Sequence, residues 1–282
     1  MNQPHNTNPD KVLLIFAMSR SGHHAIINWI QEQYPGKSYF YNHCYRNWEN
    51  KQLEPHMGYD GGVHIVDNGG SETMNIYNIE EFCPFMWEKF GMKDFEELHF
   101  DENKLEVLFI VRDPYNLMAS SYTKAPNPWQ LYKNELGYRG TRTSIFEHQV
   151  AEIAGATGYI TKDINVGLVS YNEWFSNNKY REALCDQLNI PFTDAGLQDI
   201  PSNSSFDSNN FEGKAQDMKV LERYKKYAND PRYHYCLSET LVRFGYDFFN
   251  MDPFGYHEFF DVQEDPRYLG KIATENAGVV KL

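Results

Sequence analysis

Short, strongly apolar runs alternate along the chain with segments of helical periodicity. The clearest runs are Val12–Phe16 and Leu105–Val111, and Ser38–Cys44, Val63–Asp67 and Val166–Ser170 are further strand candidates. The two clearest runs are too short for helices that carry their own core. A continuous apolar run of this length is typical of a strand buried on both faces of a sheet. The pattern therefore predicts a central, mainly parallel sheet.

Helical spacing of apolar residues follows these strand candidates. It begins after Gly22 and recurs in Tyr180–Asn189, Met218–Tyr227 and Leu237–Tyr246. Strands that alternate with helices favour the α/β class, in which helices flank the sheet. A chain of 282 residues with 41% apolar content is long enough for one sizeable core.

We therefore expect a single α/β domain over residues 11–248. A polar, disordered N-terminal tail (1–10) would precede it, and a C-terminal extension (249–282) whose role the sequence does not reveal would follow it.

The turn after the first strand carries the first candidate chemistry. Its residues are Arg20, Ser21, Gly22, His23 and His24, and a helix follows at once. Backbone N–H groups from Ser21 onward would point into such a loop, and the helix amino terminus adds partial positive charge, so phosphate or sulfate is the expected occupant. The loop lacks the Gly-Lys-Ser/Thr ending of a Walker A motif, which disfavours a magnesium-dependent ATPase.

A second strand-to-helix turn lies about ninety residues further along. Leu105–Val111 ends in Arg112-Asp113-Pro114, where Asp113 can cap a helix and Pro114 suits its first turn. Ser120 follows Arg112 by eight residues.

Together, the two turns resemble the phosphate-binding elements of the sulfotransferase family. The first resembles its 5′-phosphosulfate loop, in the Arg form familiar from carbohydrate sulfotransferases, with two histidines in place of the usual Ser/Thr pair. The second matches the Arg and Ser that hold the 3′-phosphate, here Arg112 and Ser120. The resemblance implies a P-loop-like sulfotransferase fold. It also implies 3′-phosphoadenosine 5′-phosphosulfate (PAPS) as sulfuryl donor.

Weaker parts of the resemblance cover much of residues 11–248. Tyr171, at the end of a strand, would lie near the adenine, and Lys214 is the nearest candidate for the basic loop that closes the nucleotide site. For the base that deprotonates the acceptor, His43 is the first choice, because an imidazole accepts a proton at neutral pH. Asp67 is the rival.

Composition narrows the partners. A net charge of −13 argues against a nucleic-acid surface and, less strongly, against a heavily sulfated acceptor.

No apolar run is long enough for a membrane span, so we expect a soluble, cytoplasmic protein. The four cysteines are scattered and are expected to be reduced thiols. No motif implies a metal, and His23 with His24 is interpreted as loop rather than metal ligands.

The acceptor is beyond the sequence, although a carbohydrate or another small molecule is the expected class. Two loop regions, 44–62 and 123–141, carry aromatic residues that could line its pocket. Acidic residues such as Glu80 and Glu81 are interpreted as a solvated face. Two alternatives stay open: a kinase-like enzyme that uses ATP and magnesium, and a nucleotide-binding module without catalysis.

Overall fold

The computed structural model describes residues 8–46, 53–55, 63–80, 101, 103–124, 142–153, 166–197, 219–259 and 278–279. Its strands are β1 (Lys11–Ala17), β2 (Lys37–Tyr41), β3 (Cys44–Arg46), β4 (Leu53–Pro55), β5 (Val63–Asp67), β6 (Thr73–Glu80), β7 (Leu105–Val111), β8 (Val166–Ser170) and β9 (Gly278–Val279). Its α-helices are α1 (His23–Gln33), α3 (Pro114–Lys124), α5 (Arg142–Ile153), α6 (Tyr171–Ser176), α7 (Asn178–Gln187), α8 (Pro231–His234) and α9 (Glu239–Phe249). The 3₁₀ helices are η3 (Arg223–Tyr227) and η4 (His257–Phe259).

The main sheet has the order β5-β2-β6-β1-β7-β8-β9. All neighbouring strands in it pair in parallel except β2 and β5, which are antiparallel. The expected α/β class with a central, mainly parallel sheet is therefore confirmed. Because β1 lies in the middle of the sheet, the loop that follows it opens at the carboxyl edge between β6 and β7, where open α/β sheets bind ligands.

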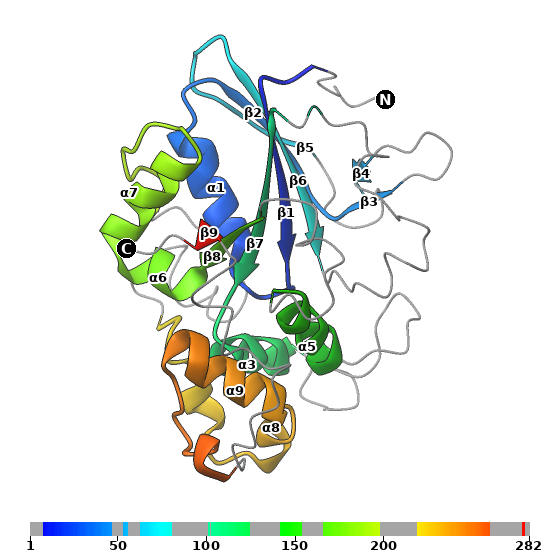
Figure 1. Ribbon diagram of the computed structural model, residues 1–282, viewed down its shortest axis with the longest axis vertical. Coiled ribbons are helices and arrows are strands. Elements are labelled where there is room, and N and C mark those ends of the chain that lie inside the picture. Colours follow the sequence, from blue (N-terminus) through cyan, green and yellow to red (C-terminus); the bar gives the residue numbers. More distant parts are fainter. Residues whose placement is uncertain are drawn as a thin grey trace.

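Alternate residues of β1 fill two different cores. Leu14 and Phe16 pack with side chains of α3, α5 and α9, whereas Leu13 and Ile15 pack with those of α1, α6 and α7. This two-sided burial explains why the strand is apolar at every position from Val12 to Ala17. Figure 1 shows α1, α6 and α7 beside the sheet, with α3, α8 and α9 gathered beyond the carboxyl ends of its strands.

Strand β6 was not expected from the sequence. It is inserted between β1 and β2, and its polar residues Asn75 and Asn78 are buried. Asn75 donates to the hydroxyl of Tyr77 at 3.1 Å, so a polar side chain in the core is partnered. The strand pairs Glu80 with Ala17, the last residue of β1, and so brings Glu80 to the edge that carries the loop.

Segments near both ends of the chain pack on the domain. Asp10, placed in the expected tail, accepts a hydrogen bond from the Thr73 backbone at 2.8 Å. The boundary expected at 248 falls one residue before the end of α9, and Phe254 beyond it contacts the Tyr115 ring at 5.8 Å. β9 extends the sheet beside β8. These described parts of 249–282 thus contribute to the same core and sheet.

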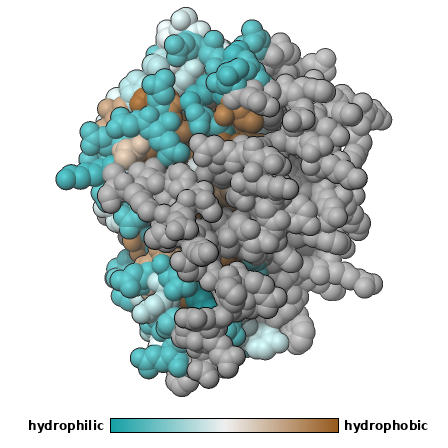
Figure 2. Space-filling view, in the orientation of Figure 1, coloured by the Kyte–Doolittle hydropathy of each residue, from teal (hydrophilic) through white to brown (hydrophobic). Residues whose placement is uncertain are grey.

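The visible surface of the described residues is largely hydrophilic, with small apolar areas (Figure 2). Among these residues, no helix is long and apolar enough to cross a membrane. Three of the cysteines, Cys44, Cys185 and Cys236, are described, and all three are buried free thiols.

Candidate functional site

The loop between β1 and α1 turns through a left-handed glycine. Gly22 precedes α1 with φ of 88°, in the left-handed region that favours glycine. The ring of Tyr171 lies against it, since a Cβ at position 22 would stand 2.2 Å from Tyr171 Cε2. Glycine is therefore required here both by the backbone and by the ring beneath it.

The amino terminus of α1 is left without a side-chain cap. Its first N–H groups, around His23 and His24, can therefore bind an anion. Ser21 does not contribute as expected, because its backbone N–H donates to the Met18 carbonyl at 3.1 Å and closes the turn. Arg20 adopts φ of 75°, a strained conformation for a residue other than glycine.

Arg112 connects the two turns that the sequence singled out. It follows β7, and its Nη1 donates to the carbonyl of Arg20 at 3.2 Å while Nη2 donates to the carbonyl of Val220. Its guanidinium carbon lies 4.7 Å from the centroid of the Tyr171 ring. The side chain is 1% exposed, and its Nε has no hydrogen-bond partner. In the described part of the chain, a buried cation is thus held by carbonyls and a ring rather than by a carboxylate.

The helix after Arg112 begins as the sequence predicts. Asp113 Oδ1 accepts from the backbone N–H of Asn116 at 2.8 Å, and Pro114 is the first helical residue. Ser120 lies on the same helix, α3, and is buried. Its hydroxyl accepts a hydrogen bond of 3.0 Å from Nη1 of Arg223, which comes from η3.

Arg223 is a buried residue beside Ser120 that the sequence did not single out. The prediction of an α-helix over Met218–Tyr227 is wrong for the residues that the structure describes, 219–227. There a turn precedes the short 3₁₀ helix η3. This change of geometry holds Arg223 in the core, 8% exposed, with its backbone N–H donating to Asn116 Oδ1 at 2.7 Å. Two buried arginines, Arg112 and Arg223, therefore flank the start of α3.

Tyr171, expected near an adenine, is the first residue of α6 and is 3% exposed. Its ring lies between Gly22 and the Arg112 guanidinium. This position lets Tyr171 support the loop and orient Arg112 at the same time. The adenine contact stays a prediction.

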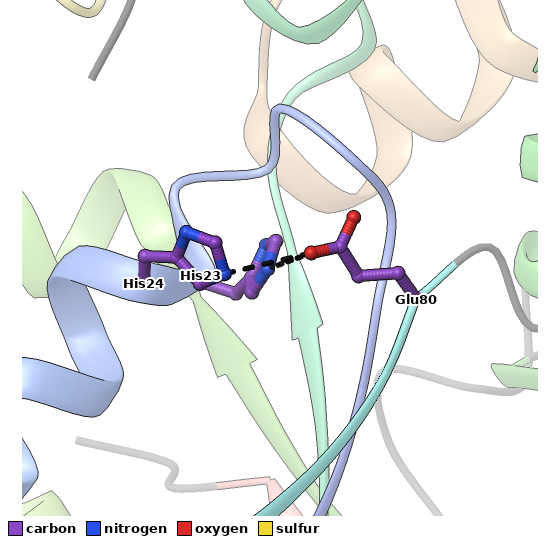
Figure 3. Close-up of side chains that lie close together, drawn as sticks. All are labelled: His23, His24 and Glu80. Atoms are coloured by element: carbon purple, nitrogen blue, oxygen red, sulfur yellow. Dashed lines mark hydrogen bonds and ion pairs between the residues drawn. The ribbon is translucent and has the colours of Figure 1, made fainter. Parts of the chain in front are cut away.

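Beside the loop, imidazoles of three histidines surround one carboxylate. Glu80 Oε1 lies 2.9 Å from His23 Nε2, 3.5 Å from His24 Nε2 and 3.3 Å from His43 Nε2. Its Oε2 accepts a hydrogen bond of 2.9 Å from Ser19. Figure 3 shows His23 and His24 from the start of α1 directed toward Glu80 at the end of β6. The expected solvated face is thus wrong for Glu80, whose side chain is 7% exposed.

The electrostatics of this cluster follow from burial and from the histidines. Burial alone would raise the pKa of Glu80, but the surrounding histidines, with His23 the largest contributor, hold it well below its usual range. Burial lowers the pKa of His23. Burial is also the largest single influence on the pKa of His24 and lowers it, but the hydrogen bond and charge of Glu80, together with a hydrogen bond to Asn42, raise the pKa overall. Glu80 is therefore ionised, and a neutral His23 donates to it from Nε2.

The two candidates for the base lie at opposite edges of the sheet. His43 follows β2 at the carboxyl edge, beside Glu80. Asp67 ends β5, which runs antiparallel to β2, and pairs in register with Lys37 at the amino edge. The structure therefore brings His43 to the loop and does not bring Asp67 there.

Other expected positions are outside the described residues. Lys214 is among them, as are most of the loop regions 44–62 and 123–141. Within the first of these regions the structure describes the β3–β4 pair in place of a continuous loop.

Comparison with known proteins yields little. No family model matches the chain, and no curated protein matches it. Among solved structures, the chain is similar to mouse sulfotransferase SULT7A1 complexed with PAP, at 13% identity and a TM-score of 0.42, over 86% of each chain.

Proposed function

We propose that the protein is a sulfotransferase that transfers a sulfuryl group from PAPS to a hydroxyl or amine of a carbohydrate or another small molecule. The observation that carries the proposal is the contact between the two phosphate-binding turns. Arg112 donates to the carbonyl of Arg20 at 3.2 Å, although the residues are 92 positions apart. One ligand with two separated anionic groups would be needed to use both turns.

The chain provides separate groups for the two ends of such a donor. The amino terminus of α1 and Arg20 would hold the 5′-phosphosulfate, with the left-handed Gly22 allowing close approach of the backbone. Arg112, Ser120 and Arg223 would hold the 3′-phosphate. The buried Arg112 Nε, which lacks a partner, suits an anionic oxygen, because a buried unsatisfied donor is costly.

Bound PAPS would supply the activated sulfuryl group. The acceptor oxygen or nitrogen forms the new bond to sulfur as the bond from sulfur to the bridging oxygen breaks. Arg20 and the loop N–H groups would stabilise the negative charge that develops on the departing phosphate of 3′-phosphoadenosine 5′-phosphate (PAP). His43 would accept the acceptor's proton.

Glu80 strengthens the case for His43 as the base. The carboxylate lies 3.3 Å from His43 Nε2 and would orient the ring and stabilise the imidazolium once the proton arrives. The side chain of His43 is 35% exposed, so an acceptor can reach it. Glu80 is itself a weaker candidate, because its lowered pKa makes it a poor proton acceptor.

The two alternatives make different predictions. A kinase-like enzyme would bind ATP in a magnesium-dependent way and would be indifferent to Arg112. A non-catalytic module would bind PAP without turnover of any acceptor. The partnering of His43 with Glu80 favours a catalytic site over this module.

The test is a calorimetric titration of the purified protein with PAP, compared with ATP plus magnesium. We expect PAP to bind, and Arg112→Ala to weaken binding by about 10- to 100-fold, the cost of losing a charge-assisted hydrogen bond. Arg232→Ala is the matched control, because that arginine is exposed on α8 and pairs with Asp230. Tighter binding of ATP, or equal PAP binding by the Arg112→Ala variant, would overturn the proposal.

A further inference from the structure

The arrangement around Glu80 contains more nitrogen donors than a carboxylate oxygen needs. Oε1 has room for about two hydrogen bonds, yet His23, His24 and His43 all direct Nε2 toward it. Asn78 Nδ2 approaches the same oxygen at 3.5 Å. Imidazole nitrogens gathered on one carboxylate oxygen are the donor set that binds divalent transition-metal ions.

We propose that His23, His24 and Glu80 form a binding site for a divalent first-row transition-metal ion, of which zinc is the representative. Their ligand atoms all lie within 4.8 Å of one another. In a tetrahedral zinc site with bonds of 2.0–2.1 Å, neighbouring ligand atoms are about 3.3 Å apart. The measured 2.9 Å and 3.5 Å from Glu80 Oε1 to the two imidazoles bracket this value.

The three ligands come from two rigid elements. His23 and His24 are the first residues of α1, and Glu80 is the last residue of β6, which is held beside β1 by parallel pairing. Figure 3 shows both imidazoles directed toward the carboxylate. Adjacent histidines alone would be weak grounds for a metal site, but here a carboxylate 57 positions away joins them.

Hydrogen bonds behind the ligands fit metal binding. His23 Nδ1 lies 3.1 Å from the Ser21 hydroxyl, whose oxygen would accept a hydrogen bond from the Nδ1–H group when Nε2 binds the ion. Ser19 donates to Glu80 Oε2 and so fixes the carboxylate while Oε1 faces the histidines. Second-sphere contacts of this kind orient ligands and typically change metal affinity by about 10- to 100-fold.

The proposed site is accessible to an ion and leaves one coordination position open. His24 is 47% exposed, whereas His23 and Glu80 are 5% and 7% exposed, so the ion would enter from the side of His24. His24 Nε2 also lies 3.1 Å from Asn42 Oδ1, and that contact would be replaced by the metal bond. Three protein ligands with His43 nearby leave a fourth position for water or an acceptor atom, the pattern of reactive rather than purely structural zinc sites.

The proposal goes beyond the sulfotransferase function, because the ion would use the histidine side chains and leave the backbone N–H groups of the loop for a phosphate. The test uses the full-length protein without nucleotide. Co²⁺ and then Zn²⁺ would be titrated, with cobalt absorption reporting coordination and a chromophoric chelator reporting zinc affinity. We expect one ion per chain and a tetrahedral cobalt spectrum.

Variants identify the ligands. His24→Asn and Glu80→Gln should each weaken zinc binding by at least about 10-fold, and Ser19→Ala by about 10-fold through the carboxylate it fixes. His257→Asn is the matched control, since that histidine stacks on Tyr246 of α9 and is not one of the three proposed ligands. Because His24 is half-exposed, its variant should fold even if the variant of buried Glu80 does not.

Absence of stoichiometric cobalt binding by wild type would overturn the proposal and leave the histidines as a hydrogen-bond network around Glu80. Equal zinc affinity of His24→Asn and wild type would also overturn it. Both readouts are independent of PAP. A protein that binds PAP but no metal would refute this inference alone, and one that binds metal but no PAP would refute the sulfotransferase proposal alone.

Discussion

The hydroxyl of Ser120 accepts a hydrogen bond of 3.0 Å from Arg223 Nη1, although the residues are 103 positions apart. The contact joins α3, which follows the second phosphate-binding turn, to η3 near the end of the domain. It adds a second buried guanidinium to the region where Arg112 lies. A distant segment of the chain therefore contributes a guanidinium beside the Ser120 hydroxyl.

Arg223→Gln should weaken PAP binding by about 10- to 100-fold, because a charge-assisted hydrogen bond to phosphate is lost. Ser120→Ala should have a smaller effect, about 3- to 10-fold, since its hydroxyl is neutral. Calorimetry measures both. Lys225→Gln is the control, because it removes a positive charge from an exposed position of the same 3₁₀ helix. Equal PAP affinity of Arg223→Gln and wild type would remove Arg223 from the site.

Gly22→Ala should abolish PAP binding and lower stability. The new Cβ would meet Tyr171 Cε2 at 2.2 Å, and alanine also pays for the left-handed backbone. Gly69→Ala separates these causes, because Gly69 has φ of 87° but no atom within 4 Å of the added Cβ. We expect the control to lose about 1 kcal/mol of unfolding free energy and to bind PAP normally. Urea unfolding measures the stability of both variants, and calorimetry measures their PAP affinity. If Gly22→Ala and Gly69→Ala had the same effects, the contact with the Tyr171 ring would have no role.

His43→Asn should lower the turnover number by about 10²- to 10⁴-fold while PAP affinity stays close to that of wild type. Asparagine is chosen because His43 has φ of 49°, a region that asparagine tolerates. Asp67→Asn should remain active, since Asp67 lies at the opposite edge of the sheet. The measurement is steady-state sulfuryl transfer to an acceptor found by screening. Loss of turnover in Asp67→Asn with an active His43→Asn would reverse the assignment.

Asp194 makes stability depend on pH. Arg181 donates to its two carboxylate oxygens at 2.6 Å and 2.8 Å, and this hydrogen bonding is the main cause that lowers the pKa of Asp194 from its ordinary 3.8. A lowered pKa in the folded state stabilises the protein above the unfolded-state value, and that stabilisation is lost as the pH falls through the folded-state value.

Asp194→Asn should therefore be less stable than wild type at pH 7, by about 1–3 kcal/mol, and the difference should shrink as the pH falls below 3.8. Urea unfolding over a pH series measures this. Asp186→Asn, a change at an exposed position of α7, the helix that carries Arg181, is the control. A difference that stays constant down to acid pH would show that the ion pair is not its source.

Strands whose side chains are buried on both faces could be predicted from the sequence. β1, β7 and β8 are largely apolar, and the turns after β1 and β7 carry Gly22 and the Asp113-Pro114 helix start in recognisable form. The local sequence is sufficient to predict these elements, because burial on both faces and helix capping each produce a recognisable pattern within a few residues.

β6 could not be predicted in this way. Asn75 and Asn78 interrupt its apolar pattern, and they are tolerated in the core because Tyr77 and Asn42 supply hydrogen-bond partners. Such partners depend on tertiary contacts that a single sequence does not reveal. Arg223 was missed for the same reason, because its importance comes from a contact with a residue far away in the chain.

The pairing of β6 with β1 also has a consequence for insertions and deletions. Side chains in a strand alternate between the two faces, so an insertion of one residue before β6 that moves the strand along β1 would place Ile79, instead of Glu80, opposite Ala17. After such an insertion, His23, His24 and His43 would keep their positions but would face the alkyl side chain of Ile79. A deletion would shift the register the other way and bring Glu81, another carboxylate, to that position. The length of the chain before β6, and not only the identity of Glu80, therefore decides whether this corner of the molecule holds a charge.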